Sequence, residues 1–188
     1  HYSNEFKFLE GYNADQKPFI ASNSTLSMLF DREELWVGTY FGGVQRIDTK
    51  RHRVKVYKHI EGDTTSLASD VVWYVYRDKK KQLWFCTLDG LSLYNKENDS
   101  FKNFTTSNSP IKSSNVRVVY EDIRGDYWFG TEDALYRYDY KGNFHEYTHV
   151  IGDSTSLCNN WIVTINEDNQ SNLWLGSYGG GISMYRPN

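Results

Sequence analysis

The segment HIEGDTTSLASD at residues 59–70 decides the fold, because the chain repeats it as HVIGDSTSLCNN at residues 149–160. Six of the twelve positions are identical, and the two copies begin ninety residues apart. A catalytic motif rarely needs a second copy at a fixed distance, whereas a chain that builds one structural unit several times must repeat its turns. The duplication therefore indicates a repeat architecture.

Four tryptophans set the length of the repeat. The hexapeptides ELWVGT, QLWFCT, DYWFGT and NLWLGS recur at spacings of 48, 44 and 46 residues and contain Trp36, Trp84, Trp128 and Trp174. An aspartate precedes each Trp, by five positions in the first unit and by six in the others: Asp31, Asp78, Asp122 and Asp168. Turn-forming residues lie between, so each Asp-to-Trp segment predicts a hairpin turn.

Each unit contains segments for about four strands. Apolar segments rich in β-branched and aromatic residues precede each Asp and predict strands buried on both faces, at 25–30, 71–76, 116–120 and 161–165. The Trp hexapeptides form the second strands, and third strands are predicted at 42–48, 90–95, 134–139 and 180–185. Short fourth strands follow at 54–57, 101–104 and 144–147. Four strands in about 45 residues is the unit of a β-propeller blade.

We therefore predict an all-β fold, a β-propeller of about four four-stranded antiparallel blades that occupies residues 1–188 as one domain or segment. The predicted units are a lone outer strand at 1–9, blades at 20–59, 67–106 and 112–149, and a blade without its outer strand at 157–188. If the lone strand completes the last blade, four blades close into a small ring without free edges. Four consecutive blades of a larger propeller would have the same boundaries.

Composition and charge exclude several classes of protein. The length suits one sizeable core, and 16% aromatic residues suit packed sheets. Net charge is −3 and the densest basic run, Lys79–Lys81, reads as a solvated turn, so we expect no nucleic acid partner. The sequence contains no apolar run of about 18 residues, so we expect no membrane insertion by this chain. No signal peptide is visible either. Because the chain begins with His1, we expect targeting signals to lie outside it.

The repeated connections have a structural explanation. Asp63 and Asp153 are expected to accept hydrogen bonds from nearby backbone amides, and Leu67 and Leu157 to anchor the far end of each connection in the core. His59 and His149 occupy equivalent places, which favours packing or hydrogen bonding over catalysis.

The two cysteines have no metal-binding spacing. Cys86 and Cys158 are predicted to be unpaired thiols in packed positions, with a disulfide as the alternative.

The order of these features resembles the two-component regulator propeller repeat. That order is SL, an Asn or Asp before V-x-x-[IV]-x-x-D, then LW, Gly and Thr, GG and a closing F-x-x-Y. Most of it is seen in SLCNNWIVTINEDNQSNLWLGSYGGGISMY at 156–185. The resemblance recurs in four units and covers nearly the whole chain. It departs at Cys86, which replaces a Gly, and at 132–134, where Glu-Asp-Ala replaces the Gly pair.

The resemblance implies a function. Such repeats are found in the periplasmic sensor region of hybrid two-component systems, best represented in Bacteroidetes, as the ectodomain of an inner-membrane receptor. A transmembrane helix and a histidine kinase core are expected elsewhere in such a protein. The implied partner is an oligosaccharide or another small ligand, and the implied role is carbohydrate sensing. Members of the family usually form larger rings than four blades.

Two other functions remain open. One is a protein–protein interaction or self-assembly scaffold that docks other receptor domains or a second copy, because the edges of an unclosed arc favour pairing. The weaker one is a propeller glycosidase or lyase. The motif D-x-x-G-x-x-W at 122–128 is similar to the Asp-box turns of sialidases, but those turns are structural, and no nucleophile, phosphate-binding or metal-ligand pattern stands out. We therefore expect no catalysis, no cofactor and no metal.

A ligand should bind at the mouth of the central channel. The connections into the innermost strands and the turns between second and third strands share this face of a propeller. Candidate residues there break the repeat pattern: from the turns Tyr40, Phe41, Asp89, Glu132, Asp133 and Tyr178, and from the connections Asp70, Trp73, Asn115, Arg117, Asn160 and Trp161. Aromatic faces can stack on sugar rings and polar groups can bind hydroxyls, whereas packing between blades is the alternative for each Trp.

Overall fold

The computed structural model describes residues 20–187, which form four antiparallel sheets and contain no helix. The first sheet comprises β1 (Thr25–Asp31), β2 (Glu34–Thr39), β3 (Val44–Asp48) and β4 (Arg53–Tyr57). The second comprises β5 (Val72–Arg77), β6 (Leu83–Thr87), β7 (Gly90–Asn95) and β8 (Ser100–Phe104). The third comprises β9 (Val116–Glu121), β10 (Tyr127–Thr131), β11 (Leu135–Tyr138) and β12 (Phe144–Tyr147). The fourth comprises β13 (Ile162–Glu167), β14 (Leu173–Ser177) and β15 (Gly181–Tyr185).

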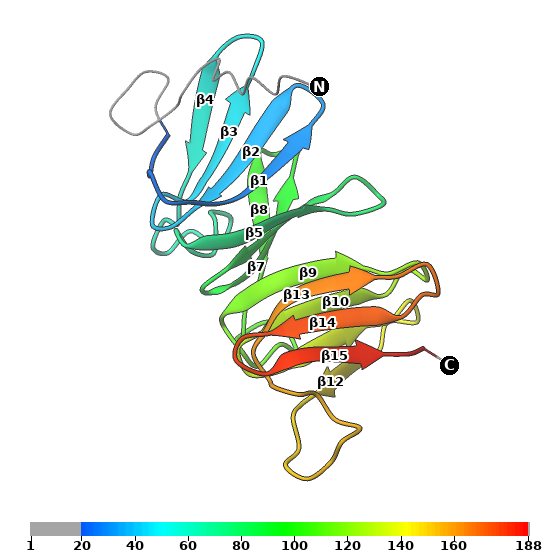
Figure 1. Cartoon of the computed structure of the whole chain (residues 1–188). Coiled ribbons are helices and arrows are strands. Elements are labelled where there is room, and N and C mark those ends of the chain that lie inside the picture. The colour runs from blue at the N-terminus through cyan, green and yellow to red at the C-terminus, as the bar shows by residue number, and fades with distance from the viewer. Residues whose placement is uncertain (1–19, 188) are drawn as a thin grey trace, which may run out of the picture.

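Each sheet is an up-and-down meander, in which strands adjacent in sequence pair with one another. Figure 1 shows the sheets stacked as an arc, with the first sheet in blue and cyan at one end and β13–β15 in orange and red at the other. Among the described residues the main contacts join only consecutive sheets, so the arc is not closed. The predicted all-β propeller fold is confirmed, and the lone strand expected within 1–9 lies outside the described residues.

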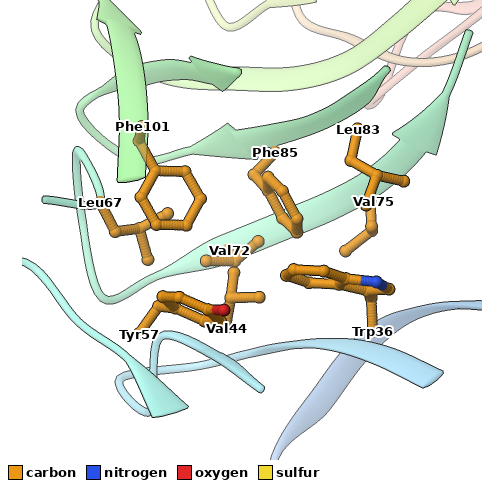
Figure 2. Close-up of a cluster of buried hydrophobic side chains, with 9 residues drawn as sticks. All are labelled: Trp36, Val44, Tyr57, Leu67, Val72, Val75, Leu83, Phe85 and Phe101. Carbon is orange, nitrogen blue, oxygen red and sulfur yellow. The ribbon is translucent and has the colours of Figure 1, made fainter. Parts of the chain in front are cut away.

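A hydrophobic core fills each gap between neighbouring sheets. In the first gap, the indole of Trp36 lies 5.5 Å from the ring of Phe85, and Tyr57 meets Phe101 edge-on at 5.4 Å (Figure 2). Leu67 of the repeated connection is fully buried in this core, as predicted. Equivalent clusters form around Trp84 in the second gap and Trp128 in the third. The sheets are therefore held together by large side chains that the repeat supplies once per unit.

The Asp-to-Trp segments are turns locked by one carboxylate. The indole Nε1 of Trp84, Trp128 and Trp174 donates to Asp78, Asp122 and Asp168 respectively, at 2.9 Å in each case. The other carboxylate oxygen accepts from the backbone N–H four residues on, at 2.7–2.9 Å. These aspartates are thus structural, as expected for a repeated turn.

The repeated connections have the predicted construction. Asp63 accepts from the backbone N–H and the hydroxyl of Thr65, at 2.8 and 2.7 Å. The Nδ1 atoms of His59 and His149 lie 2.9 and 2.6 Å from the carbonyl oxygens of Leu67 and Leu157. Both histidines therefore serve the turn.

Two expectations about burial are wrong. Cys86 is buried, but Cys158 is exposed, although Ala68 at the equivalent place of the first repeated connection is buried, and neither cysteine is in a disulfide. The prediction that all inner strands are buried on both faces fails at β1, where Leu26, Met28 and Phe30 are exposed. No described sheet covers that face, so an apolar strand sequence alone does not guarantee burial.

Candidate functional site

The innermost strand of every sheet carries a β-bulge near its start. The pairing shifts between Val72 and Tyr74 in β5 and between Val116 and Val118 in β9, so Trp73 and Arg117 are the extra residues. A bulge leaves its extra residue unpaired and redirects the side chain. The same irregularity in β1 and β13 places Leu26 and Val163 at the equivalent positions. The residue at the bulge therefore varies from sheet to sheet. Two of these residues, Trp73 and Arg117, are ligand-binding candidates from the sequence.

Six of the predicted residues form one continuous row across the four sheets. We call it the central row, and it consists of Phe41, Tyr40, Trp73, Arg117, Trp161 and Tyr178. The rings of Tyr40 and Phe41 lie 4.3 Å apart, and Tyr40 lies 5.9 Å from Trp73. At the other end the rings of Trp161 and Tyr178 lie 4.5 Å apart. Residues separated by up to 138 positions thus share one surface.

Arg117 joins the two halves of the row. Its Cζ lies 3.8 Å from the ring centroid of Trp73 and 5.7 Å from that of Trp161, within the range of cation–π attraction. Burial lowers the pKa of Arg117, and the nearby negative charge of Glu132 opposes this shift. An arginine starts from so high a pKa that the guanidinium stays charged at neutral pH. The centre of the row is therefore a partly desolvated positive charge between two indole faces.

The tryptophans of the row differ from three of the four tryptophans of the repeated turns. The Nε1 atoms of Trp73 and Trp161 are shielded from solvent and have no hydrogen-bond partner among residues 20–187. In the repeated turns, by contrast, Trp84, Trp128 and Trp174 donate to an aspartate. Only Trp36, in the turn that is one residue shorter, shares the unpaired Nε1 among the described residues. An unpaired buried donor costs about 1–3 kcal/mol, and such groups need an explanation beyond packing.

Phe41 adds a strained aromatic side chain at one end of the row. Its φ is 64°, in the left-handed region that bulky side chains rarely adopt, and its ring is largely exposed. Strained backbone of this kind clusters at functional sites, where the surroundings hold it in place.

A second pair lies beside the row in the third sheet. The amide Nδ2 of Asn115 donates to Oε1 of Glu132, while Asn115 Oδ1 is buried without a partner among the described residues. Both residues were predicted from the sequence, and the structure brings them together. This hydrogen bond engages one oxygen of the Glu132 carboxylate. The negative charge of the same carboxylate acts to raise the pKa of Arg117.

The other four predicted residues are not part of the row. Asp70 and Asn160 accept hydrogen bonds from the backbone N–H of His59 and His149 and so complete the connections. Asp89 and Asp133 are exposed turn residues whose own backbone N–H groups donate to Thr87 and Thr131. Neither aspartate makes a contact with the row, so their predicted ligand role stays a prediction.

The central row lies on an open surface. A hollow of about 500 Å³ between the second and third sheets lies elsewhere and is lined by Trp84, Phe104, Tyr127 and Phe144 among others. The hollows lined by Trp36 and Tyr147 likewise lack every residue of the row. A ligand at the row would therefore be held by stacking on its rings and by the charge of Arg117.

The described part of the chain offers no apolar helix of membrane-spanning length. Within the same residues, no three His, Cys, Asp or Glu side chains come together as a metal site would require.

Comparisons with known proteins agree with this fold. The chain is similar to the extracellular domain of the hybrid two component system BT3049 from B. thetaiotaomicron, with 24% identity and a TM-score of 0.77 over 93% of this chain. It covers 22% of that much longer chain. The extracellular domain of BT4673 from the same organism gives 21% identity, a TM-score of 0.53, and coverage of 88% of this chain and 27% of that one.

An enzyme also shares the fold. Virginiamycin B lyase from Staphylococcus aureus is 16% identical with a TM-score of 0.57, over 86% of this chain and 55% of the lyase. At such identities these likenesses establish the fold alone. A search among curated protein sequences finds no significant match.

The family comparison is more specific. The sequence pattern described as "Two component regulator propeller" matches residues 110–133 and 156–179. Each match runs from the connection before an innermost strand to the turn after the second strand, which is the part of the unit that carries the Asp-to-Trp turn. The chain thus carries repeats of the two component regulator propeller family.

Proposed function

We propose that this chain is part of the extracytoplasmic ligand-recognition propeller of a bacterial two-component signalling receptor, and that its ligand is derived from a carbohydrate. The observation that carries the proposal is the central row, because it gathers aromatic faces from the first, second and fourth sheets and the guanidinium of Arg117 from the third, at positions that the repeat does not explain. Flat rings flanked by polar groups suit a sugar, which has apolar faces and polar edges. The family repeats support the signalling context.

The proposed role is recognition without catalysis. A receptor signals only if its ligand binds one of two conformational states better than the other. An arc whose sheets each contribute to one surface can couple binding to the spacing of the sheets. The kinase that would read this change lies in other parts of such a receptor.

A thermal-shift screen against plant, host and microbial oligosaccharides tests the proposal. A ligand at one hundred times its dissociation constant adds about 2.7 kcal/mol to stability, which shifts the midpoint by several degrees. The shift should disappear in Tyr178→Ala and persist in Tyr140→Ala. These tyrosines are similarly exposed, at 64% and 67%, but only Tyr178 lies in the row. A folded protein that shifts with no oligosaccharide contradicts the carbohydrate proposal.

A second candidate function is assembly with a second copy of the chain, and the exposed end faces favour it. Met28 of β1 is 64% exposed, whereas Val75, Val119 and Ile165 at the same register in the other sheets are at most 4% exposed. At the other end, Ile182 of β15 is 66% exposed, whereas its counterparts Val44, Leu91 and Leu135 are buried. One chain thus carries both halves of an interface that it forms three times internally.

Light scattering over a dilution series distinguishes the two functions. Assembly through the end faces predicts a dimer or larger species that Ile182→Glu dissociates. The control Ile151→Glu changes an isoleucine that is 92% exposed in a connection and should leave the species unchanged. A monomer at all concentrations would leave ligand recognition as the sole candidate.

A further inference from the structure

Three arginines of the chain stack over tryptophan rings, and they are not equivalent. The Cζ atoms of Arg46, Arg137 and Arg117 lie 5.8, 5.5 and 3.8 Å from the ring centroids of Trp36, Trp128 and Trp73. All three guanidinium groups are partly shielded from solvent. They therefore form an internal comparison of what such an arginine binds in this protein.

The first two arginines each have a carboxylate partner. Arg137 donates through Nε and Nη2 to Oδ2 of Asp126, both at 2.7 Å. Arg46 lies 3.5 Å from Oε1 of Glu34 and 3.7 Å from Oδ1 of Asp99. Stacking satisfies the face of the guanidinium, and the carboxylate satisfies its edge, where the N–H donors point.

Arg117 has the stacking but not the carboxylate. Within the described part of the chain, its guanidinium makes no hydrogen bond and no ion pair, and the closest electrostatic partner, Glu132, is bonded to Asn115. The guanidinium nitrogens of Arg117 still reach solvent, so water supplies their acceptors in the free protein. A ligand that displaces this water must offer an acceptor in its place, because a charged group that is removed from water unpaired loses more than a neutral one. The centre of the central row therefore lacks the one group that both comparable arginines have.

We propose that the ligand supplies this group, so that the central row recognises an acidic saccharide whose uronate carboxylate binds the edge of Arg117 while its sugar rings stack on the flanking aromatic side chains. A planar carboxylate matches the guanidinium fork with two parallel hydrogen bonds, which a tetrahedral sulfate ester matches less well. Trp73 with Tyr40 lies on one side of the charge, and Trp161 with Tyr178 on the other. Uronate residues within an oligosaccharide would thus be held between aromatic faces. This inference rests on the proposed function and names the class of its ligand.

Paired ligands test the inference with the unaltered protein. Tetrasaccharides of homogalacturonan, alginate and hyaluronan are titrated calorimetrically as free acids and as methyl esters, which keep the rings and remove the negative charge. At least one free acid should bind, and its ester should bind at least tenfold more weakly. A tetrasaccharide that carries sulfate esters but no uronate serves as the competing anion. It should bind more weakly than the acid.

Variants then assign the effect to Arg117. Arg117→Met keeps the apolar stem and should lose the preference for acid over ester, whereas Arg117→Lys should retain a smaller preference as a point charge. Arg53→Met removes an exposed arginine of β4 with the same net charge change and should bind as the unaltered protein does. Circular dichroism confirms that each variant is folded.

The outcomes separate the inference from the function on which it rests. Equal binding of acid and ester, or binding of neutral oligosaccharides alone, overturns the acidic ligand and leaves carbohydrate recognition standing. Tighter binding of the sulfated saccharide overturns the uronate assignment. Failure of every acidic and neutral oligosaccharide to bind overturns both proposals.

Discussion

The third and fourth sheets contain the same local structure in different surroundings. Trp128 and Trp174 occupy the same place in the repeat and donate the same 2.9 Å hydrogen bond to Asp122 and Asp168. Yet Trp128 is 1% exposed and Trp174 is 42% exposed, because the fourth sheet covers the first indole and no described sheet covers the second. The difference shows that the turn is encoded within one unit, whereas the burial of its tryptophan depends on the next unit.

The largest expected effect on stability comes from replacing the two tryptophans themselves. Trp128→Ala should lower the free energy of unfolding by about 3–5 kcal/mol, because it leaves a cavity in a packed core. Trp174→Ala should cost no more than about 2 kcal/mol, because much of its ring is already in water. Denaturant titration of the two variants measures the difference. Equal losses would mean that something covers Trp174 in solution.

The aspartates of the two turns give the next comparison. Asp122→Ala should destabilise the protein by about 2 kcal/mol, because it leaves the buried indole N–H of Trp128 and the backbone N–H of Asp126 without an acceptor. Asp168→Ala removes the same bonds, but water can replace them at this exposed end, so its effect should be smaller. Thermal melts of both variants, with Asn as the conservative replacement, measure the order. A larger loss of stability in Asp168→Ala than in Asp122→Ala would show that burial of the turn does not determine how much its aspartate contributes.

A smaller effect is expected at the fourth position of each turn. Gly125 has a φ of 88° in the third sheet, whereas Ser171 holds a φ of 63° at the same place in the fourth. A side chain in this left-handed conformation costs about 1–2 kcal/mol, partly offset by the greater flexibility of Gly when unfolded. Ser171→Gly should therefore raise stability by up to about 1 kcal/mol, and Gly125→Ser should lower it by a similar amount. Opposite signs in denaturant titration would show that the turn selects the side chain rather than the backbone conformation.

The smallest effect is the pH dependence of the exposed turn. Hydrogen bonds from the side chains of Asn172 and Trp174 lower the pKa of Asp168 below its ordinary value. The unfolded chain therefore binds the proton first, so the stabilisation is complete above about pH 5 and is lost as the pH falls further. The stability difference between the unaltered protein and Asp168→Asn should shrink between pH 5 and pH 2. A constant difference across that range would show that protonation does not reach this turn.

The repeat predicted the turns, but it did not predict how one irregular spacing changes the hydrogen bonds of its turn. Asp31 precedes Trp36 by five residues instead of six, and Trp36 Nε1 is buried without a partner among the described residues. Asp31 instead accepts a 2.8 Å hydrogen bond from Arg77 of the second sheet. A period in the sequence shows where a turn lies, but one residue fewer changes the reach of its carboxylate, and only coordinates show the new partner.

The candidate site was predictable as a surface rather than as a geometry. Positions that break the repeat included all six residues of the central row, because the repeat already accounts for the packing residues. The bulges that make Trp73 and Arg117 the extra residues left no recognisable sequence signal, since they depend on the register with β6 and β10. Asp70 and Asn160 also break the pattern, but the structure engages them in hydrogen bonds within the connections.

The amino-acid sequence by itself determined the unit of this protein. Its period, its turns and its strands follow from local chemistry that each unit repeats: a carboxylate that locks a turn, and side chains that suit a sheet. The tertiary structure decided which faces are covered, which carboxylates meet which arginines, and that Arg117 lies between two indoles without an anion. These outcomes depend on strand register and on contacts between sheets, which no local pattern specifies.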